Sequence, residues 1–161
     1  MPALALFGIS IIFSFTAWGI VTAQIIWPEL RDRSHVDALR PLLTLHTFRF
    51  VGLSFLIPGV VSPDLPAAFA MPAAYGDIAA AILALLSLAA IRSSLGIPLV
   101  WVFNVWGSAD LINAFYQANA VGLLPGELGA AFYIPTAIVP FLLITHALMF
   151  RLLLRREPAA A

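Results

Sequence analysis

The stretch PLLTLHTFRFVGLSFLIPG, residues 41–59, is almost entirely apolar and contains His46 and, three residues later, Arg49. Its length is close to the roughly 20 residues that a helix needs to cross the hydrocarbon core of a bilayer. A charged side chain at the centre of a bilayer costs about 2.5–3.5 kcal/mol on insertion scales. The stretch therefore indicates a membrane-spanning segment whose polar residues have partners or a function inside the protein.

The composition of the whole chain agrees with a membrane protein. Of 161 residues, 62% are hydrophobic and 10% are charged, and the mean hydropathy is +1.01. Soluble domains have about a quarter of their residues charged. The chain has no cysteine, which excludes disulfides, thiolate metal sites and covalent haem attachment. The net charge is zero, so the overall charge gives no indication of a nucleic-acid partner, and the expected partner is the lipid bilayer.

Apolar runs recur along the chain and are joined by short polar or Pro/Gly-containing connections. We predict an all-α, polytopic membrane protein, a five-helix bundle that forms one transmembrane domain over residues 1–161. A bundle of helices is expected because the backbone in lipid must satisfy its own hydrogen bonds. The N-terminal run is too long for a signal peptide and lacks a basic region, so we expect it to be retained. The predicted helices cover approximately residues 4–27, 40–60, 72–91, 96–118 and 129–153.

The distribution of arginine predicts the orientation. All eight basic residues are Arg, and seven of them fall at the end of the predicted bundle that carries the 28–39 connection, the 92–95 turn and the C-terminus. Basic residues favour the cytoplasmic side, so we expect the N-terminus outside and the C-terminus in the cytoplasm. The seven residues are Arg31, Arg33, Arg40, Arg92, Arg151, Arg155 and Arg156.

Two histidines are expected at one depth in the membrane. His46 lies about 9 Å along the second predicted helix from Arg40, and His146 lies about 6–10 Å from the end of the fifth, at a rise of 1.5 Å per residue. Because the two helices run in opposite directions, both rings are expected in the cytoplasmic leaflet. Such a pair could supply the two axial nitrogens of one haem b, with Arg40, Arg49 or Arg151 near its propionates.

This arrangement resembles that of di-histidine membrane b-type cytochromes, over the two ligand helices only. The resemblance implies electron transfer, or a haem-bearing subunit or sensor, with a quinone or another redox protein as partner. The alternative interpretation is structural, since a membrane histidine can bond a Ser, a Thr or a carbonyl of the next helix. Thr44 and Thr145 lie beside the two histidines in sequence.

A second polar group is predicted around Arg49. Asp110, Asn113 and Gln117 recur at i, i+3 and i+7, one face of a helix. Arg49 and Asp110 are expected at similar depths, about 14 Å and 21 Å from the cytoplasmic ends of their helices. Buried membrane charges usually pair, so we predict an Arg49–Asp110 ion pair. Asp77 is expected in the outer leaflet, about five residues inside the third helix.

The cluster of Arg49, Asp77, Asp110, Asn113 and Gln117 has two interpretations. It could line a polar cavity, open to the outside, of a small cofactor-free transporter or channel-like protein. It could instead hold the helices together, as in a structural or assembly subunit of a larger complex. No nucleophile–base pair, phosphate loop or metal motif indicates a hydrolase, and the sequence leaves the oligomeric state open.

A third feature is the segment FAMPAAYGDIAAAILALL, residues 69–86. Through Pro72, Ala73, Gly76 and Asp77 it resembles a segment of small uncharacterised bacterial inner-membrane proteins, in which a Pro-Ala-x-x-Gly-Asp run opens a helix. The resemblance covers about a tenth of the chain. It implies a bacterial inner-membrane location and a role for Asp77.

Overall fold

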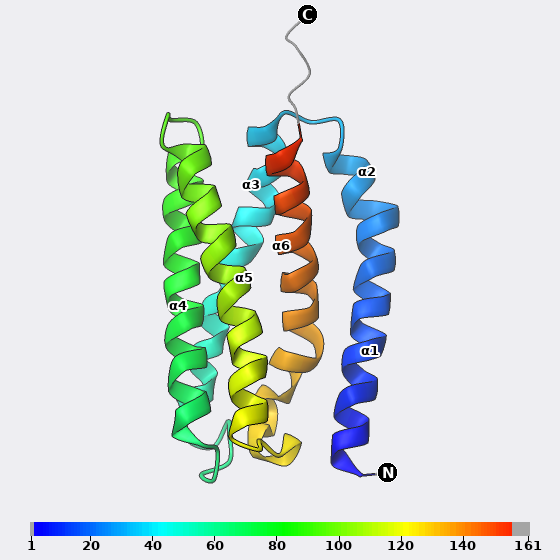
Figure 1. Ribbon diagram of the computed structural model, residues 1–161, viewed down its shortest axis with the longest axis vertical. Helices are drawn as coiled ribbons and strands as arrows, with labels where there is room; N and C mark the ends of the chain where they lie inside the picture. The colour runs from blue at the N-terminus through cyan, green and yellow to red at the C-terminus, as the bar shows by residue number, and fades with distance from the viewer. Residues whose placement is uncertain (1, 156–161) are drawn as a thin grey trace, which may run out of the picture.

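The computed structural model describes residues 2–155, and this part of the chain is all-helical, as predicted (Figure 1). The first helical segment runs from Ala3 to Leu30. A π-helical turn, η1 (Thr22–Ile26), divides it into α1 (Ala3–Val21) and α2 (Trp27–Leu30). This turn ends two residues before Pro28, which lacks the N–H of a regular ladder, and such interruptions are typical places for π turns. Residues 2–155 thus contain six α-helices in place of the five uninterrupted ones predicted.

The remaining elements run alternately up and down beside one another (Figure 1). A 3₁₀ helix, η2, directly continues α3, and two short irregular helices, η3 and η4, precede α6. We call the end of the bundle at which α1 begins the N end, and the opposite one, at which α6 finishes, the C end. The bounds are α3 (His35–His46), η2 (Thr47–Leu56), α4 (Ala67–Ala90), α5 (Gly96–Ala120), η3 (Pro125–Phe132), η4 (Ile134–Ile138) and α6 (Val139–Leu154).

Two helices begin earlier than predicted. Helix α3 begins at His35 because the Ser34 hydroxyl accepts a hydrogen bond from the backbone N–H of Asp37, at 3.2 Å, and caps the helix. Helix α4 begins at Ala67, and Pro72 lies inside it. Asp77 therefore lies ten residues inside α4, about 15 Å from the helix start, which is deeper than predicted.

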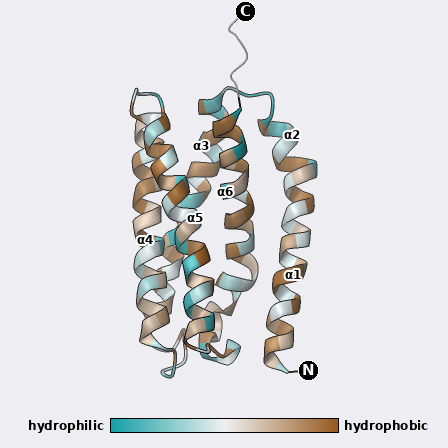
Figure 2. Ribbon diagram, viewed as in Figure 1, coloured by the Kyte–Doolittle hydropathy of each residue, from teal (hydrophilic) through white to brown (hydrophobic). Residues whose placement is uncertain are grey.

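Within residues 2–155, three helical stretches are long and apolar enough to cross a membrane: Ala3–Leu30, Ala67–Ala90 and Ile134–Leu154, with mean hydropathies of 2.1, 1.8 and 2.1. Helix α5 is not among them, and neither is α3 with its 3₁₀ continuation. These two elements carry most of the polar residues described below. Figure 2 shows the corresponding hydrophilic colour within α5 and at the connections of the C end.

Helix α1 lies at the edge of the bundle, beside α6 (Figure 1). None of its residues is buried. The Trp18 indole N–H donates to the carbonyl of Ala137 at 3.0 Å, and the ring stacks on Phe141 with centroids 4.1 Å apart. These contacts fasten α1 to the η4–α6 segment and leave its other face apolar and exposed, as expected of a helix that contacts lipid.

At the N end, backbone hydrogen bonds join the connection before α4 to η3. The N–H of Ala130 donates to the carbonyl of Val60 at 2.8 Å, and the N–H of Ser62 donates to the carbonyl of Glu127 at 3.0 Å. Gly129 has a φ of 52° at this contact, and a Cβ there would lie 2.3 Å from the Val60 oxygen. Only glycine fits this position without strain.

Candidate functional site

The 3₁₀ helix η2 presents a straight row of residues to the centre of the bundle. Its buried residues are Arg49, Gly52 and Phe55, and His46 directly precedes it at the end of α3. Because a 3₁₀ helix has three residues per turn, side chains at i and i+3 lie directly above one another. In an α-helix the same four residues would rotate away from a common face. The local 3₁₀ geometry therefore places His46 and Arg49 on the same buried face.

Arg49 is the centre of the site and is 1% exposed. Its Nε donates to Asp77 Oδ1 of α4 at 2.8 Å, and its Nη2 lies 2.7 Å from the same oxygen. Nη2 also donates to Asp110 Oδ2 of α5 at 2.6 Å. The predicted Arg49–Asp110 ion pair is thereby confirmed. The sequence did not predict that Asp77 shares the guanidinium.

The other side of the guanidinium faces α5 and α6. Nη1 donates to the carbonyl of Gly107 at 3.0 Å and lies 3.4 Å from Nε2 of His146. A guanidinium has five N–H groups and no acceptor. Each of the three nitrogens of Arg49 has at least one acceptor in these contacts, so the guanidinium is occupied within the protein. The hydrogen-bonding capacity that remains at the cluster belongs to the carboxylate oxygens.

Three glycines make room for these side chains. A Cβ on Gly52 would lie 2.1 Å from Asp77 Oδ2, and a Cβ on Gly76 would lie 1.7 Å from Asp110 Oδ1. A Cβ on Gly107 would lie 2.7 Å from His146 Nε2 and 2.8 Å from Arg49 Nη1. Real Cβ atoms do not approach so closely, so each glycine provides the space that one polar group occupies.

His146 is held in one tautomer by Asn104 of α5. The Asn104 side-chain N–H₂ donates to the His146 carbonyl at 3.3 Å, so its Oδ1 is the atom that lies 2.7 Å from His146 Nδ1. An amide oxygen only accepts, so Nδ1 carries the proton. Nε2 is then the unprotonated nitrogen and accepts from Arg49. His146 is therefore a neutral, fully bonded ring between two fixed partners.

His46 makes a different contact. Its Nε2 lies 3.0 Å from the Thr145 hydroxyl, which itself donates to the carbonyl of Leu142 at 2.9 Å. The hydroxyl proton is thus committed to the helix, and Nε2–H of His46 donates to the oxygen. Nδ1 of His46 has no hydrogen-bond partner among residues 2–155. This contact is of the kind that the structural interpretation of the histidines expected, a bond to a Thr on another helix.

The two imidazole rings lie together, as a pair of haem ligands would require, but in direct contact. Their centroids are 4.2 Å apart, and Phe103 packs on both rings at 5.2 and 5.3 Å. Two imidazoles on opposite sides of an iron, at about 2 Å per Fe–N bond, have their ring centres about 6 Å apart with the porphyrin between them. The described arrangement therefore does not fit a haem between His46 and His146. Ligation would require the rings to separate and His146 to lose a partner.

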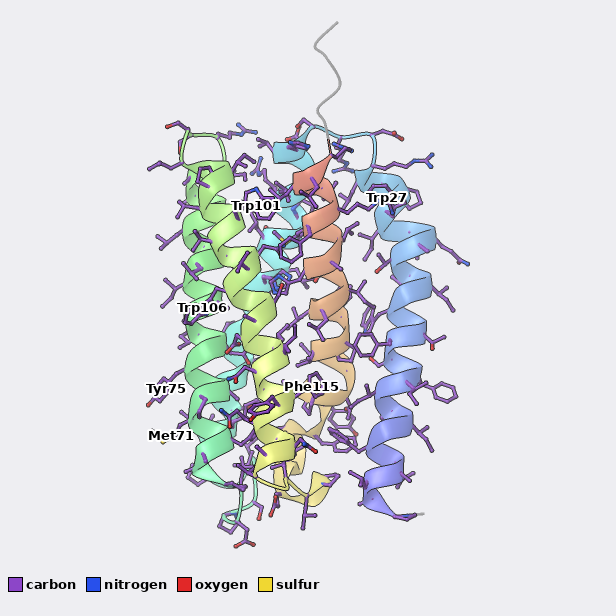
Figure 3. All side chains as sticks on the ribbon, viewed as in Figure 1. Trp27, Met71, Tyr75, Trp101, Trp106 and Phe115 are labelled. Carbon is purple, nitrogen blue, oxygen red and sulfur yellow. The ribbon has the colours of Figure 1, made fainter. Side chains whose placement is uncertain are left out.

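Apart from the buried Arg49, the arginines proposed to contact the haem propionates lie at the surface of the C end. Arg40 is exposed. Arg151 lies over the ring of Trp27, 3.8 Å from its centroid, a cation–π contact at the position that Figure 3 labels. Arg155 donates to the backbone carbonyls of Arg31 and Arg33. Arg156 lies outside the described residues.

A cavity of about 420 Å³ extends from the carboxylates of the site toward the N end. Asp77 and Asp110 are its only charged lining residues within the described chain, and Asn119 is a further polar one. Phenylalanines from four elements form much of the remaining wall, among them Phe115, which Figure 3 labels in the lower half of α5. The four are Phe7, Phe55, Phe69 and Phe115.

A second, shallower hollow of about 410 Å³ opens on the outside of α4 and α5. We call it the α4–α5 groove, and Asp110 lines both the groove and the cavity. Asn113 of the predicted polar face lines the groove, whereas Gln117 is half-buried and lines neither hollow. The groove is formed by Pro72, Tyr75, Gly76, Trp106, Ala109, Asp110 and Asn113.

Comparison with known families identifies the chain. Residues 6–154 match a family model described as a domain of unknown function, DUF8737, so the chain belongs to this family. The matched range includes every residue of the site described above. No curated protein and no solved structure matches the chain.

Proposed function

We propose that this member of the DUF8737 family is a small membrane carrier whose binding centre is the cluster of Arg49, Asp77 and Asp110. In this proposal the chain crosses a bacterial inner membrane five times. The three apolar stretches are three of these spans. The other two are α5 and α3 with η2, which carry the buried Asn104 and Arg49. The arginine-rich C end lies in the cytoplasm, and the cavity lies toward the outer face.

The observation that carries the proposal is the cavity that ends on buried carboxylates. A hollow of about 420 Å³ with apolar walls and a few polar groups has the form and size of a small-molecule site. Within the membrane, ionisable residues that face a cavity commonly mark a path for substrate or protons. A purely structural ion pair would not require a hollow beside it.

The charge of the cluster supports a transported proton or solute. One guanidinium faces two carboxylates. The hydrogen-bond partners of the buried His46 and His146 are uncharged or cationic, so neither ring has a partner for a positive charge and both are neutral. With both carboxylates ionised the buried cluster carries one excess negative charge, which is costly in a dry site. A proton or a ligand that donates hydrogen bonds would neutralise it.

The close packing toward the C end supports a carrier that is closed on its cytoplasmic side. Between the histidines and the C end lies a tightly packed apolar layer, in which Leu39, Leu43, Val100, Phe103 and Leu152 are all fully buried. A carrier that is open to one side and closed to the other has this asymmetry. Alternation would require the packed layer to open when the N end closes.

Haem binding by His46 and His146 is the second candidate, and it would require the two rings, whose centroids are 4.2 Å apart, to separate. It would make the protein a b-type electron-transfer subunit or sensor. The measurement that separates it from the carrier is a visible spectrum of protein purified from cells with ample haem supply. A low-spin b-type spectrum that either His→Ala variant abolishes would favour haem.

The carrier is tested in proteoliposomes that enclose a pH-sensitive dye. A panel of solutes with one apolar body and different heads (amine, alcohol, amide, carboxylate) is added outside, and protein-dependent proton movement is recorded. We expect a response to at least one donor head group, lost in Asp110→Asn and reduced in Ala114→Leu, which would fill the cavity. Gly19→Ala, on the lipid-facing helix, is the matched control. No protein-dependent response to any head group would overturn the proposal.

A further inference from the structure

The two carboxylates that share Arg49 differ in their surroundings. Asp77 receives both Nε and Nη2 of the guanidinium on one oxygen, and its other oxygen fits against Gly52. Asp110 receives Nη2 alone. The Asp77 side chain is 9% exposed and that of Asp110 is 12% exposed. Asp77 is therefore the more firmly held counter-ion of the arginine.

Asp110 occupies a boundary position. It lines the internal cavity on one side and the α4–α5 groove on the other. Its Oδ1 fills the space where Gly76 lacks a Cβ, so the carboxylate lies directly against the backbone of α4. Within residues 2–155, Asp110 is the only charged residue that lines the groove. A molecule in the groove would therefore meet the carboxylate of Asp110.

The groove itself combines aromatic rings with that carboxylate. Tyr75 of α4 and Trp106 of α5 line it, and both side chains are at least half exposed. Figure 3 labels both on the same side of the molecule. A cation near a Trp or Tyr face gains about 0.5–2 kcal/mol, most where water is excluded. Aromatic faces with one carboxylate form a site for organic cations.

The hydrogen bonds of Arg49 also indicate a positively charged ligand. Every nitrogen of Arg49 already has an acceptor within the protein, so the guanidinium is not free to bind an anion. The cluster offers carboxylate oxygens and one excess negative charge. The complementary ligand is a monocation, and the apolar walls on both sides of Asp110 select one with an apolar body.

We propose that Asp110 is the exchange carboxylate of the carrier and that the α4–α5 groove admits a lipid-soluble organic monocation from the bilayer to it. This proposal rests on the proposed function and names its ligand class. Binding converts the Asp110 carboxylic acid and the free cation into a carboxylate–cation pair and one released proton. No bond other than the O–H bond of the acid breaks, and the charge of the site does not change.

The probe is tetraphenylphosphonium, a permanent apolar monocation, with tetraphenylborate as an anion of the same shape. Protein in nanodiscs of zwitterionic lipid is equilibrated with each ion, and binding to empty nanodiscs is subtracted. We expect saturable binding of the cation and none of the anion. Below the pH at which Asp110 ionises, cation affinity should rise by about tenfold per pH unit as one proton is released per cation bound. Equal saturable binding of both ions, or none of either, would overturn the proposal.

Variants locate the site. Asp110→Asn removes the charge and should weaken cation binding by more than about tenfold, which is an energy of about 1.4 kcal/mol. Trp106→Leu should weaken it by about three- to tenfold through loss of the cation–π contact. Gly76→Ala should also weaken it, because a Cβ would displace the Asp110 carboxylate, whereas Gly19→Ala has open space and should bind as the wild type does.

These variants remain informative where one of them does not fold. If Asp110→Asn is unstable, the pH dependence and proton release of the wild-type protein and the Trp106→Leu affinity decide the matter. Unchanged affinity in both Trp106→Leu and Gly76→Ala would contradict the groove. Cation binding without proton-coupled transport would overturn the carrier function but leave the ligand class standing. Transport of uncharged solutes without cation binding would overturn the ligand class but leave the carrier function standing.

Discussion

The two halves of the bundle are packed differently on either side of the polar layer. Toward the C end, the apolar core contains fully buried Leu39, Leu43, Phe103, Met149 and Leu152. Toward the N end, the apolar side chains line a cavity of about 420 Å³ that ends on Asp77 and Asp110. The difference indicates that one half is close-packed and the other contains open space.

The largest effect is expected in the layer that separates the halves. Arg49→Met leaves two carboxylates buried without their partner and should cost about 3–5 kcal/mol of unfolding free energy, measured by denaturation in mild detergent. The triple variant with Asp77→Asn and Asp110→Asn should recover most of that loss, because no unpaired charge remains. Equal losses in the single and the triple variant would show that the ion cluster is not what holds the two halves together.

The packing difference itself predicts unequal costs for the same substitution. Leu43→Ala, in the packed half, should cost about 3 kcal/mol, because it opens a new cavity among fully buried neighbours. Leu111→Ala, at the cavity wall, should cost about half as much, because one side of this side chain already borders the cavity. Similar losses at both positions, in the same denaturation assay, would mean that the N-end half is as tightly packed as the other.

A substitution within the polar layer tests its geometry. Gly107→Ala would place a Cβ within 2.8 Å of both His146 and Arg49 and should cost about 1–3 kcal/mol through overpacking. Gly19→Ala, with nothing within 4 Å, should be neutral or slightly stabilising. The two melting temperatures provide the comparison. A neutral Gly107→Ala would argue against the close approach of α5 to the Arg49–His146 pair.

The smallest effect is expected at the histidine that has only one partner. Thr145→Val removes the acceptor of His46 Nε2 and should cost about 1–2 kcal/mol, because the buried N–H is left unpaired. The matched change Thr44→Val, at an exposed hydroxyl that bonds only its own helix, should cost less than half of that. Imidazole NMR should show a changed environment for His46 and an unchanged His146 tautomer. A changed His146 tautomer would show that the two rings form one coupled unit.

Several features followed from the sequence alone. The apolar runs predicted the all-helical fold, and three of the five predicted spans correspond to the apolar stretches found within residues 2–155. Helical rise placed Arg49 and Asp110 at similar depths, and the cost of unpaired membrane charge predicted their ion pair. The same argument brought His46 and His146 to one level, where their rings meet. These predictions succeeded because depth in a membrane helix is linear in residue number.

Other features were decided only by tertiary structure. Asp77 reaches Arg49 because α4 begins at Ala67, and nothing in the sequence distinguished that start from Pro72. The 3₁₀ winding of η2 aligns Arg49 with Gly52, although its residues suit an α-helix equally well. The partners of each histidine nitrogen and the cavity depend on rotation about the helix axes and on which neighbours leave space. Sequence determines the depth of a residue in a membrane bundle, but helix packing determines the direction in which its side chain points.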